Sequence, residues 1–155
     1  MHKFHGLQLA IDLAVQQRDA RLAAMGQAQG RLRMGEQQQE QLQSYANDTD
    51  ARWASGASVA ISAELVRHHY QFVGRLQHAI GMQEGVIANL VRHVEASRAD
   101  LAQAEAKVAG LQKVLASRLA VVQRAEQRRD QAQTDEMAAL AYARKRAATQ
   151  MEDFP

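Results

Sequence analysis

Histidines are the residues of this sequence whose side chains could hold a metal ion or move a proton. Adjacent residues such as His68 and His69 point to different sides of a helix, so they cannot bind one ion together. No His-Glu-x-x-His spacing, which sets two zinc ligands on one helix face, is present. We therefore interpret the histidines as polar side chains and expect no metal site. The six are His2, His5, His68, His69, His78 and His93.

The motifs of nucleotide-binding and hydrolytic enzymes are also missing from the sequence. It contains neither a Gly-x4-Gly-Lys-Ser/Thr loop, which cradles phosphates, nor a Gly-x-Ser-x-Gly elbow, which presents a nucleophile. With no cysteine, it has no disulfide and no thiolate ligand. We predict a protein that is not an enzyme, with no catalytic residue, no cofactor and no small-molecule substrate.

The composition is typical of long helices. Hydrophobic residues make up 46% of the 155 residues and aromatic residues only 5%. Much of the hydrophobic fraction is alanine, which buries little area, so we expect a thin helix-to-helix seam. No apolar run is long enough to cross a bilayer, which takes about 20 residues. The first thirteen residues lack the apolar core of a signal peptide, so we expect a cytoplasmic protein.

Basic side chains gather toward the C-terminus, although the net charge is only +2. They are either a solvated helix face with ion pairs four residues apart, or a basic surface for an acidic protein partner. Binding of nucleic acid is disfavoured, because acidic residues dilute the basic ones. The basic residues are Arg118, Arg124, Arg128, Arg129, Arg144, Lys145 and Arg146, and the acidic ones are Glu126, Asp130, Asp135 and Glu136.

The second half of the sequence carries a sustained heptad repeat. Every seventh residue from Val66 to Val122 is aliphatic, and the row three residues further on is mixed. This pattern predicts a helix over about residues 60–148. The aliphatic row is Val66, Val73, Ile80, Ile87, Val94, Leu101, Val108, Leu115 and Val122.

A weaker repeat precedes it and predicts a helix over about residues 5–54. Small residues at about 55–59 favour a turn, with Gly56 in the left-handed conformation and Ser58 or Ser62 capping the next helix. We therefore predict an all-α fold in which residues 1–155 form one elongated antiparallel coiled-coil hairpin with a short frayed tail.

Two features of this hairpin exceed what a self-sufficient seam needs. If the turn is centred near residue 57, the numbers of two facing residues add to about 114. The first helix then has no residue left to face the second helix beyond about residue 110. The overhang to about residue 148 then projects on the order of 55 Å. Near the turn, a second apolar row of Leu65, Phe72, Ala79 and Val86 should face Leu42 and Tyr45. This row either thickens the core or covers a third element.

Several segments, in this order and spacing, resemble the FliJ family, the small coiled-coil component of the bacterial flagellar type III export apparatus. Tyr70-Gln71-Phe72 with Leu76 and Ala79-Ile80 is similar to the family's signature segment. Leu7 with Asp12-Leu13-Ala14 resembles its opening helix, and Tyr45 with Asn47 the end of that helix. Asp135-Glu136 with Ala138, Ala141 and Arg144-Lys145 resembles its closing segment.

The resemblance implies a stalk similar to the γ subunit of rotary ATPases. Its paired termini would enter the hexamer of the export ATPase, promote assembly of that ring and activate it. It would also contact the cytoplasmic domain of the export gate and the export chaperones, peripherally at the inner face of the cell membrane. It would thereby serve flagellum biogenesis, motility and chemotaxis. The gate surface maps onto Gln38, Leu42, Tyr45, Phe72, Leu76 and Ala79, with departures at Thr49 and Gln83.

Candidate ring contacts are Arg124, Arg128, Arg129 and Arg144. Two alternatives to the flagellar stalk stay open at this point. One is the equivalent stalk of a virulence injectisome, which has the same physical features. The other is a homodimeric coiled-coil scaffold, in which the overhang would pair with a second copy.

Overall fold

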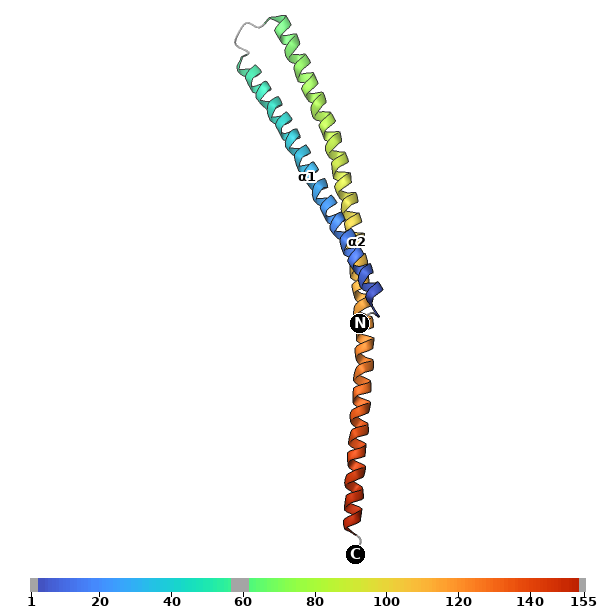
Figure 1. Cartoon of the computed structure of the whole chain (residues 1–155). Coiled ribbons are helices and arrows are strands. Elements are labelled where there is room, and N and C mark those ends of the chain that lie inside the picture. Colours follow the sequence, from blue (N-terminus) through green and yellow to red (C-terminus); the bar gives the residue numbers. More distant parts are fainter. Residues whose placement is uncertain (1–2, 57–61, 154–155) are drawn as a thin grey trace. The chain divides into compact units, whose positions relative to one another are not determined.

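A computed structural model describes residues 3–56 and 62–153 of the chain. It contains two helices, α1 (His5–Ser55) and α2 (Ala63–Glu152), and the described residues form no strand (Figure 1). The predicted all-α class, with two helices of which the second is longer, is confirmed. None of the described helices has a stretch apolar and long enough to cross a membrane.

The ends of the helices next to the connection are capped by local hydrogen bonds. The Leu65 amide donates to Ser62 Oγ at 3.2 Å, so Ser62 caps α2 as predicted. The Gly56 amide donates to the Arg52 carbonyl at 3.0 Å and continues the helical pattern. No described glycine has a positive φ, so the prediction of a left-handed Gly56 is wrong. Ser58 and most of the predicted turn lie outside the described residues.

The chain divides into two compact units. Residues 12–108, called here the hairpin unit, hold most of α1 and the first half of α2. Residues 1–11 and 109–155, called here the terminal unit, hold the start of α1 and the rest of α2.

The core of the hairpin unit is the predicted heptad seam. In α2 every member of the aliphatic row is buried or half-buried, and Val94, Leu101 and Val108 are among the most buried residues of the chain. Ala14 and Ala28, which belong to the weaker row of α1, are 2% and 1% exposed. Small side chains on α1 therefore face larger aliphatic ones on α2, which allows a close helix-to-helix distance.

The register of this seam differs from the predicted one. Gly35 lies against Ile87 and Leu90, and Trp53 stacks on His69. The numbers of facing pairs thus add to between 117 (Tyr45 with Phe72) and 125 (Gly35 with Leu90), not to about 114. The reason is that α1 ends at Ser55 and α2 begins at Ala63, so the connection is centred near residue 59. The predicted pairing of Met25 with Leu90 is wrong.

A polar contact marks this register inside the seam. Gln83 belongs to the mixed row of α2, because it stands three residues after Ile80 of the aliphatic row. Its side-chain Nε2 donates to the Gly35 carbonyl of α1 at 2.9 Å. The same amide lies 3.3 Å from Gln38 Oε1. A Cβ on Gly35 would lie 2.9 Å from Leu90 Cδ1, so glycine permits the close approach of the two helices here. The seam amide is therefore satisfied by a partner on the opposite helix.

Unlike Gly35 of α1, three glycines of α2 have open space around them, and replacing them by alanine should stabilise the chain. A Cβ on Gly74, Gly81 or Gly85 would meet nothing within 4 Å. Because alanine is favoured over glycine inside a helix by about 1 kcal/mol, the triple alanine variant should gain roughly 2–3 kcal/mol of unfolding free energy. Urea unfolding followed by circular dichroism measures this. Gly35→Ala is the matched control and should gain less than any of the three, since Leu90 must move. An equal gain from Gly35→Ala would contradict the close approach.

Within the terminal unit, the residues before α1 lie against the second half of α2. Lys3 and Phe4 lie beside Ser117, Arg118, Val121 and Val122, and these six residues line a shallow cavity of about 380 Å³. Val122 is the last half-buried residue, and every described residue after it is exposed. Pairing thus ends at Val122 and not near residue 110, because the register is displaced. We call Gln123–Glu152 the distal segment; its 30 residues of helix extend over about 45 Å.

Candidate interaction surfaces

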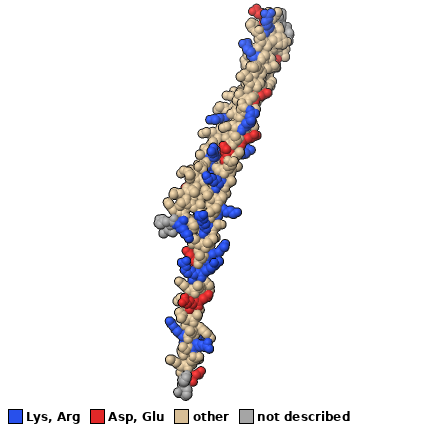
Figure 2. Space-filling model, turned by 90° about the vertical axis from the view of Figure 1, so that its right-hand side faces the viewer, with Lys and Arg blue, Asp and Glu red and all other residues tan. Residues whose placement is uncertain are grey.

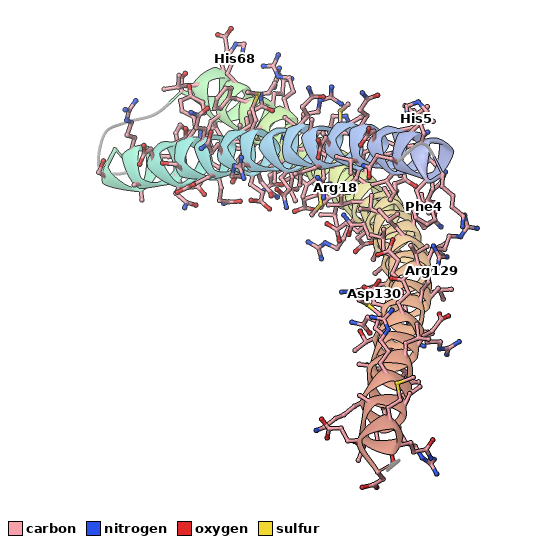
Figure 3. The ribbon with its side chains drawn as sticks, turned by 60° about the horizontal axis from the view of Figure 1, so that its bottom comes forward. Phe4, His5, Arg18, His68, Arg129 and Asp130 are labelled. Carbon is pink, nitrogen blue, oxygen red and sulfur yellow. The ribbon has the colours of Figure 1, made fainter. Side chains whose placement is uncertain are left out.

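The described histidines do not gather at one site, although His68 and His69 are neighbours in α2. His69 is half-buried and stacks on Trp53, with ring centroids 3.8 Å apart and planes within 4°. His68 is exposed, and its Nε2 lies 4.0 Å from Glu64 Oε1 (Figure 3). No three His, Asp or Glu side chains within residues 3–56 and 62–153 come close enough to hold a metal ion. His2 falls outside the described residues.

An aromatic contact joins the two helices of the hairpin unit near the connection. Tyr45 of α1 packs against Phe72 of α2 with ring centroids 5.8 Å apart and an interplanar angle of 81°. This edge-to-face arrangement is a favourable geometry for aromatic pairs, and it confirms that Tyr45 faces the second apolar row. In that row Leu65 and Val86 remain 53% and 46% exposed, whereas Phe72 and Ala79 are half-buried. Part of the row thickens the core, and part is an apolar surface.

The six predicted gate residues lie at different depths in this region. Tyr45 is 52% exposed and is the most accessible apolar member. Gln38 is exposed and lies beside Gln83 of the opposite helix. Leu76 is only 8% exposed, so it belongs to the core of the seam. The half-buried members are Leu42, Phe72 and Ala79. The structure therefore brings Tyr45 and Phe72 together at the surface and places Leu76 beneath it.

The four predicted ring residues Arg124, Arg128, Arg129 and Arg144 are all exposed on the distal segment. At about 100° of rotation per residue, Arg128 and Arg129 point in clearly different directions, and Arg144 points nearly opposite to Arg124. Positive charge is thus distributed around the helix and not along one face.

Charges of both signs occur along the distal segment, with Glu126 and Asp130 among its first arginines. Figure 2 shows basic side chains around the helix, an acidic band next to them and a second basic band further along. Among the described residues from 123 to 153, no side chain forms an ion pair within 4.0 Å. The intrahelical pairs considered from the sequence are therefore not formed. No two oppositely charged residues of this segment stand four positions apart: Arg124 precedes Arg128, and Glu126 precedes Asp130, so both spacings join like charges.

Three large apolar side chains of the distal segment were not singled out by the sequence reasoning. Met137, Leu140 and Tyr142 are 71%, 53% and 67% exposed. They fall after the heptad row ends, in an alanine-rich stretch without charge. The three-residue spacing from Met137 to Leu140 was the signal that could have found two of them.

An all-helical hairpin whose exposed apolar and charged surfaces lie along its helices is typical of coiled-coil proteins that act by binding other proteins. Comparison with known proteins identifies the class further. The family model described as Flagellar FliJ protein matches residues 3–147. The chain belongs to the FliJ family, and it is therefore a non-enzymatic component of flagellar protein export. No curated protein and no solved structure matches the chain.

Proposed function

We propose that this protein is the central stalk and activator of the flagellar export ATPase ring. The observation that carries the proposal is the distal segment, thirty residues of continuous helix with no residue buried. An isolated helix in water gains little stability beyond its own hydrogen bonds, so such a segment is expected to serve a partner. The resemblance to the FliJ family implies that this partner is the hexameric export ATPase.

The charge distribution supports a surrounding partner. Arginines that point in several directions from one helix suit a partner that surrounds the helix, as the wall of a central hole does. In this proposal Arg124, Arg128, Arg129 and Arg144 contact the ring. Lys3 and Phe4, which lie beside Val121 and Val122, bring the start of α1 to the entrance of the hole. The test is stimulation of ATP hydrolysis by the full chain and by a chain that ends at Val122.

The proposed stalk also links the ring to the export gate and to export chaperones. The patch formed by Tyr45 and Phe72 with the exposed Leu65 and Val86 supports this role, because aromatic side chains at a surface are common anchors of protein interfaces. We place the protein in the cytoplasm, held at the inner face of the cell membrane through the export apparatus. The family assignment favours this flagellar role over that of an injectisome stalk.

Tyr45→Ala should weaken binding of the cytoplasmic domain of the gate by at least about tenfold, the effect of losing one aromatic anchor. The helical circular dichroism signal should stay unchanged, because Tyr45 is half in solvent. Leu76→Ala does not separate binding from folding, because the loss of this seam side chain destabilises the hairpin itself. Isothermal titration calorimetry measures the affinity. Leu22→Ala, 55% exposed on α1 and 23 residues before Tyr45, is the control outside the patch. Equal binding by the Tyr45 and Leu22 variants would contradict the patch.

A further inference from the structure

The shallow cavity of the terminal unit combines an apolar lining with basic side chains. Phe4, Val121 and Val122 are its apolar members, and Phe4 lies beside this part of α2 (Figure 3). Lys3 and Arg118 line it as well, and both are exposed. Val121 is 63% exposed, although the residues before α1 lie against α2 here. An apolar surface is therefore left uncovered at this place.

This apolar surface continues along α2 by one heptad. Val114 is 41% exposed and stands seven residues before Val121, so both side chains lie on the same face of the helix, about 10 Å apart. Arg118 stands four residues after Val114 and three before Val121, so its side chain projects from that face too. The face thus offers two apolar positions with a positive charge between them.

Only positive charge surrounds this face. No aspartate or glutamate occurs in residues 1–11 or 109–125. Among the described residues, no lysine or arginine of these two ranges has an acidic partner within 4.0 Å. Charges of one sign beside a cavity of low polarity attract a group of the opposite sign from outside. The basic residues are Lys3, Lys113, Arg118 and Arg124.

From the apolar lining and the one-sided charge we propose that this face binds an acidic amphipathic helix of another protein. Two apolar side chains seven residues apart on the partner helix cover Val114 and Val121, and the second of them enters the cavity against Phe4. Carboxylates three and four residues from the first apolar side chain come within reach of Arg118, which stands between the two valines. Charge complementarity thus selects the partner, and the heptad spacing selects its helical form.

A protein helix suits this face better than an anionic membrane does. Binding of a helix to a membrane scales with the apolar area that it buries, and this face covers two turns only. Glu126 and Asp130 follow directly on α2 and would be repelled by anionic lipids. The inference goes beyond the stalk proposed above, because it assigns a binding site to residues before the distal segment. Binding is measured with the export ATPase absent, so its outcome is independent of the stalk proposal.

Fluorescence anisotropy of a labelled helical peptide tests the site on the full chain. The peptide carries leucines at positions i and i+7, glutamates at i+3 and i+4, and alanine elsewhere. We expect saturable binding that weakens by roughly tenfold between low and high salt, because the charge attraction is screened. Two control peptides, one with lysine for glutamate and one with alanine for leucine, should not bind. No binding of the first peptide, or equal binding of the lysine peptide, overturns the proposal, as does binding of the chain to phosphatidylserine vesicles without binding of the peptide.

Two pairs of variants locate the peptide on the chain. Arg118→Glu should abolish binding of the acidic peptide and gain binding of the lysine peptide, whereas Arg146→Glu, the same change on the distal segment, should bind as the parent does. Val121→Ala should weaken binding by about threefold to tenfold. Leu119→Ala should not, because its side chain points nearly opposite to that of Val121. All four side chains are exposed, so the helical circular dichroism signal should stay unchanged. Equal effects within either pair would place the peptide elsewhere and refute the site.

Discussion

A chain that ends at Val122 is expected to lose all stimulation of the export ATPase while unfolding at nearly the same temperature as the full chain. The two properties separate because pairing between α1 and α2 ends at Val122, and every described residue beyond it is exposed. Removal of the distal segment takes away the four candidate ring arginines without opening the seam. Steady-state ATP hydrolysis and thermal circular dichroism give the two readouts.

The matched control is a chain that ends at Thr149. It removes only six residues and keeps Arg124, Arg128, Arg129 and Arg144, so it should stimulate ATP hydrolysis as the full chain does. Full stimulation of ATP hydrolysis by the chain that ends at Val122 would contradict the stalk proposal. A large fall in its melting temperature would instead show that the distal segment supports the hairpin, contrary to its exposure.

Leu101→Ala should lower the free energy of unfolding by about 2–4 kcal/mol, the usual cost of removing a buried leucine side chain. Leu101 is 8% exposed and lies between Val94 and Val108, the other strongly buried members of its row. A thin seam has few alternative contacts, so the loss should spread along neighbouring turns and lower cooperativity as well. Urea unfolding measures the midpoint and the slope of the transition.

Leu119→Ala provides the comparison, since the same atoms are removed from a side chain that is 49% exposed in the same helix. Its cost should stay within about 0.5 kcal/mol. If both substitutions cost the same, the aliphatic row would not be the source of the hairpin's stability.

The aliphatic row was predictable because nine consecutive heptad positions are aliphatic, a longer run than the second apolar row near the connection has. The register was not, for the same physical reason: a repeat of seven residues fits nearly as well after a slip. What distinguishes the observed register are particular contacts, above all Gln83 donating to the Gly35 carbonyl and Leu90 lying over the missing Cβ of Gly35. From the sequence alone, the polar Gln83 side chain in the mixed row is expected to weaken the seam. In the structure its amide has an acceptor on α1, the Gly35 carbonyl.

The candidate surfaces, like the seam, were predicted only in part. The meeting of Tyr45 and Phe72 followed from the wide apolar stripe near the connection. Leu76 was predicted both in the mixed row of the seam and on the gate surface, and its 8% exposure shows that it is a seam residue. On the distal segment the basic and acidic residues were recognised from the sequence, but the lack of ion pairs among the described residues from 123 to 153 was not.

The stack of Trp53 on His69 gives this protein an optical reporter of its own. Trp53 is the only tryptophan, and its indole ring lies flat against an imidazole of the other helix at the connection end of the hairpin. Indole emission depends on the rings and water in contact with it, so the intrinsic fluorescence of the unlabelled chain follows the separation of α1 and α2 at that end. Events at the turn, including a partner wedging between Tyr45 and Phe72 two turns away, can thus be timed in a stopped-flow cell without attaching a dye.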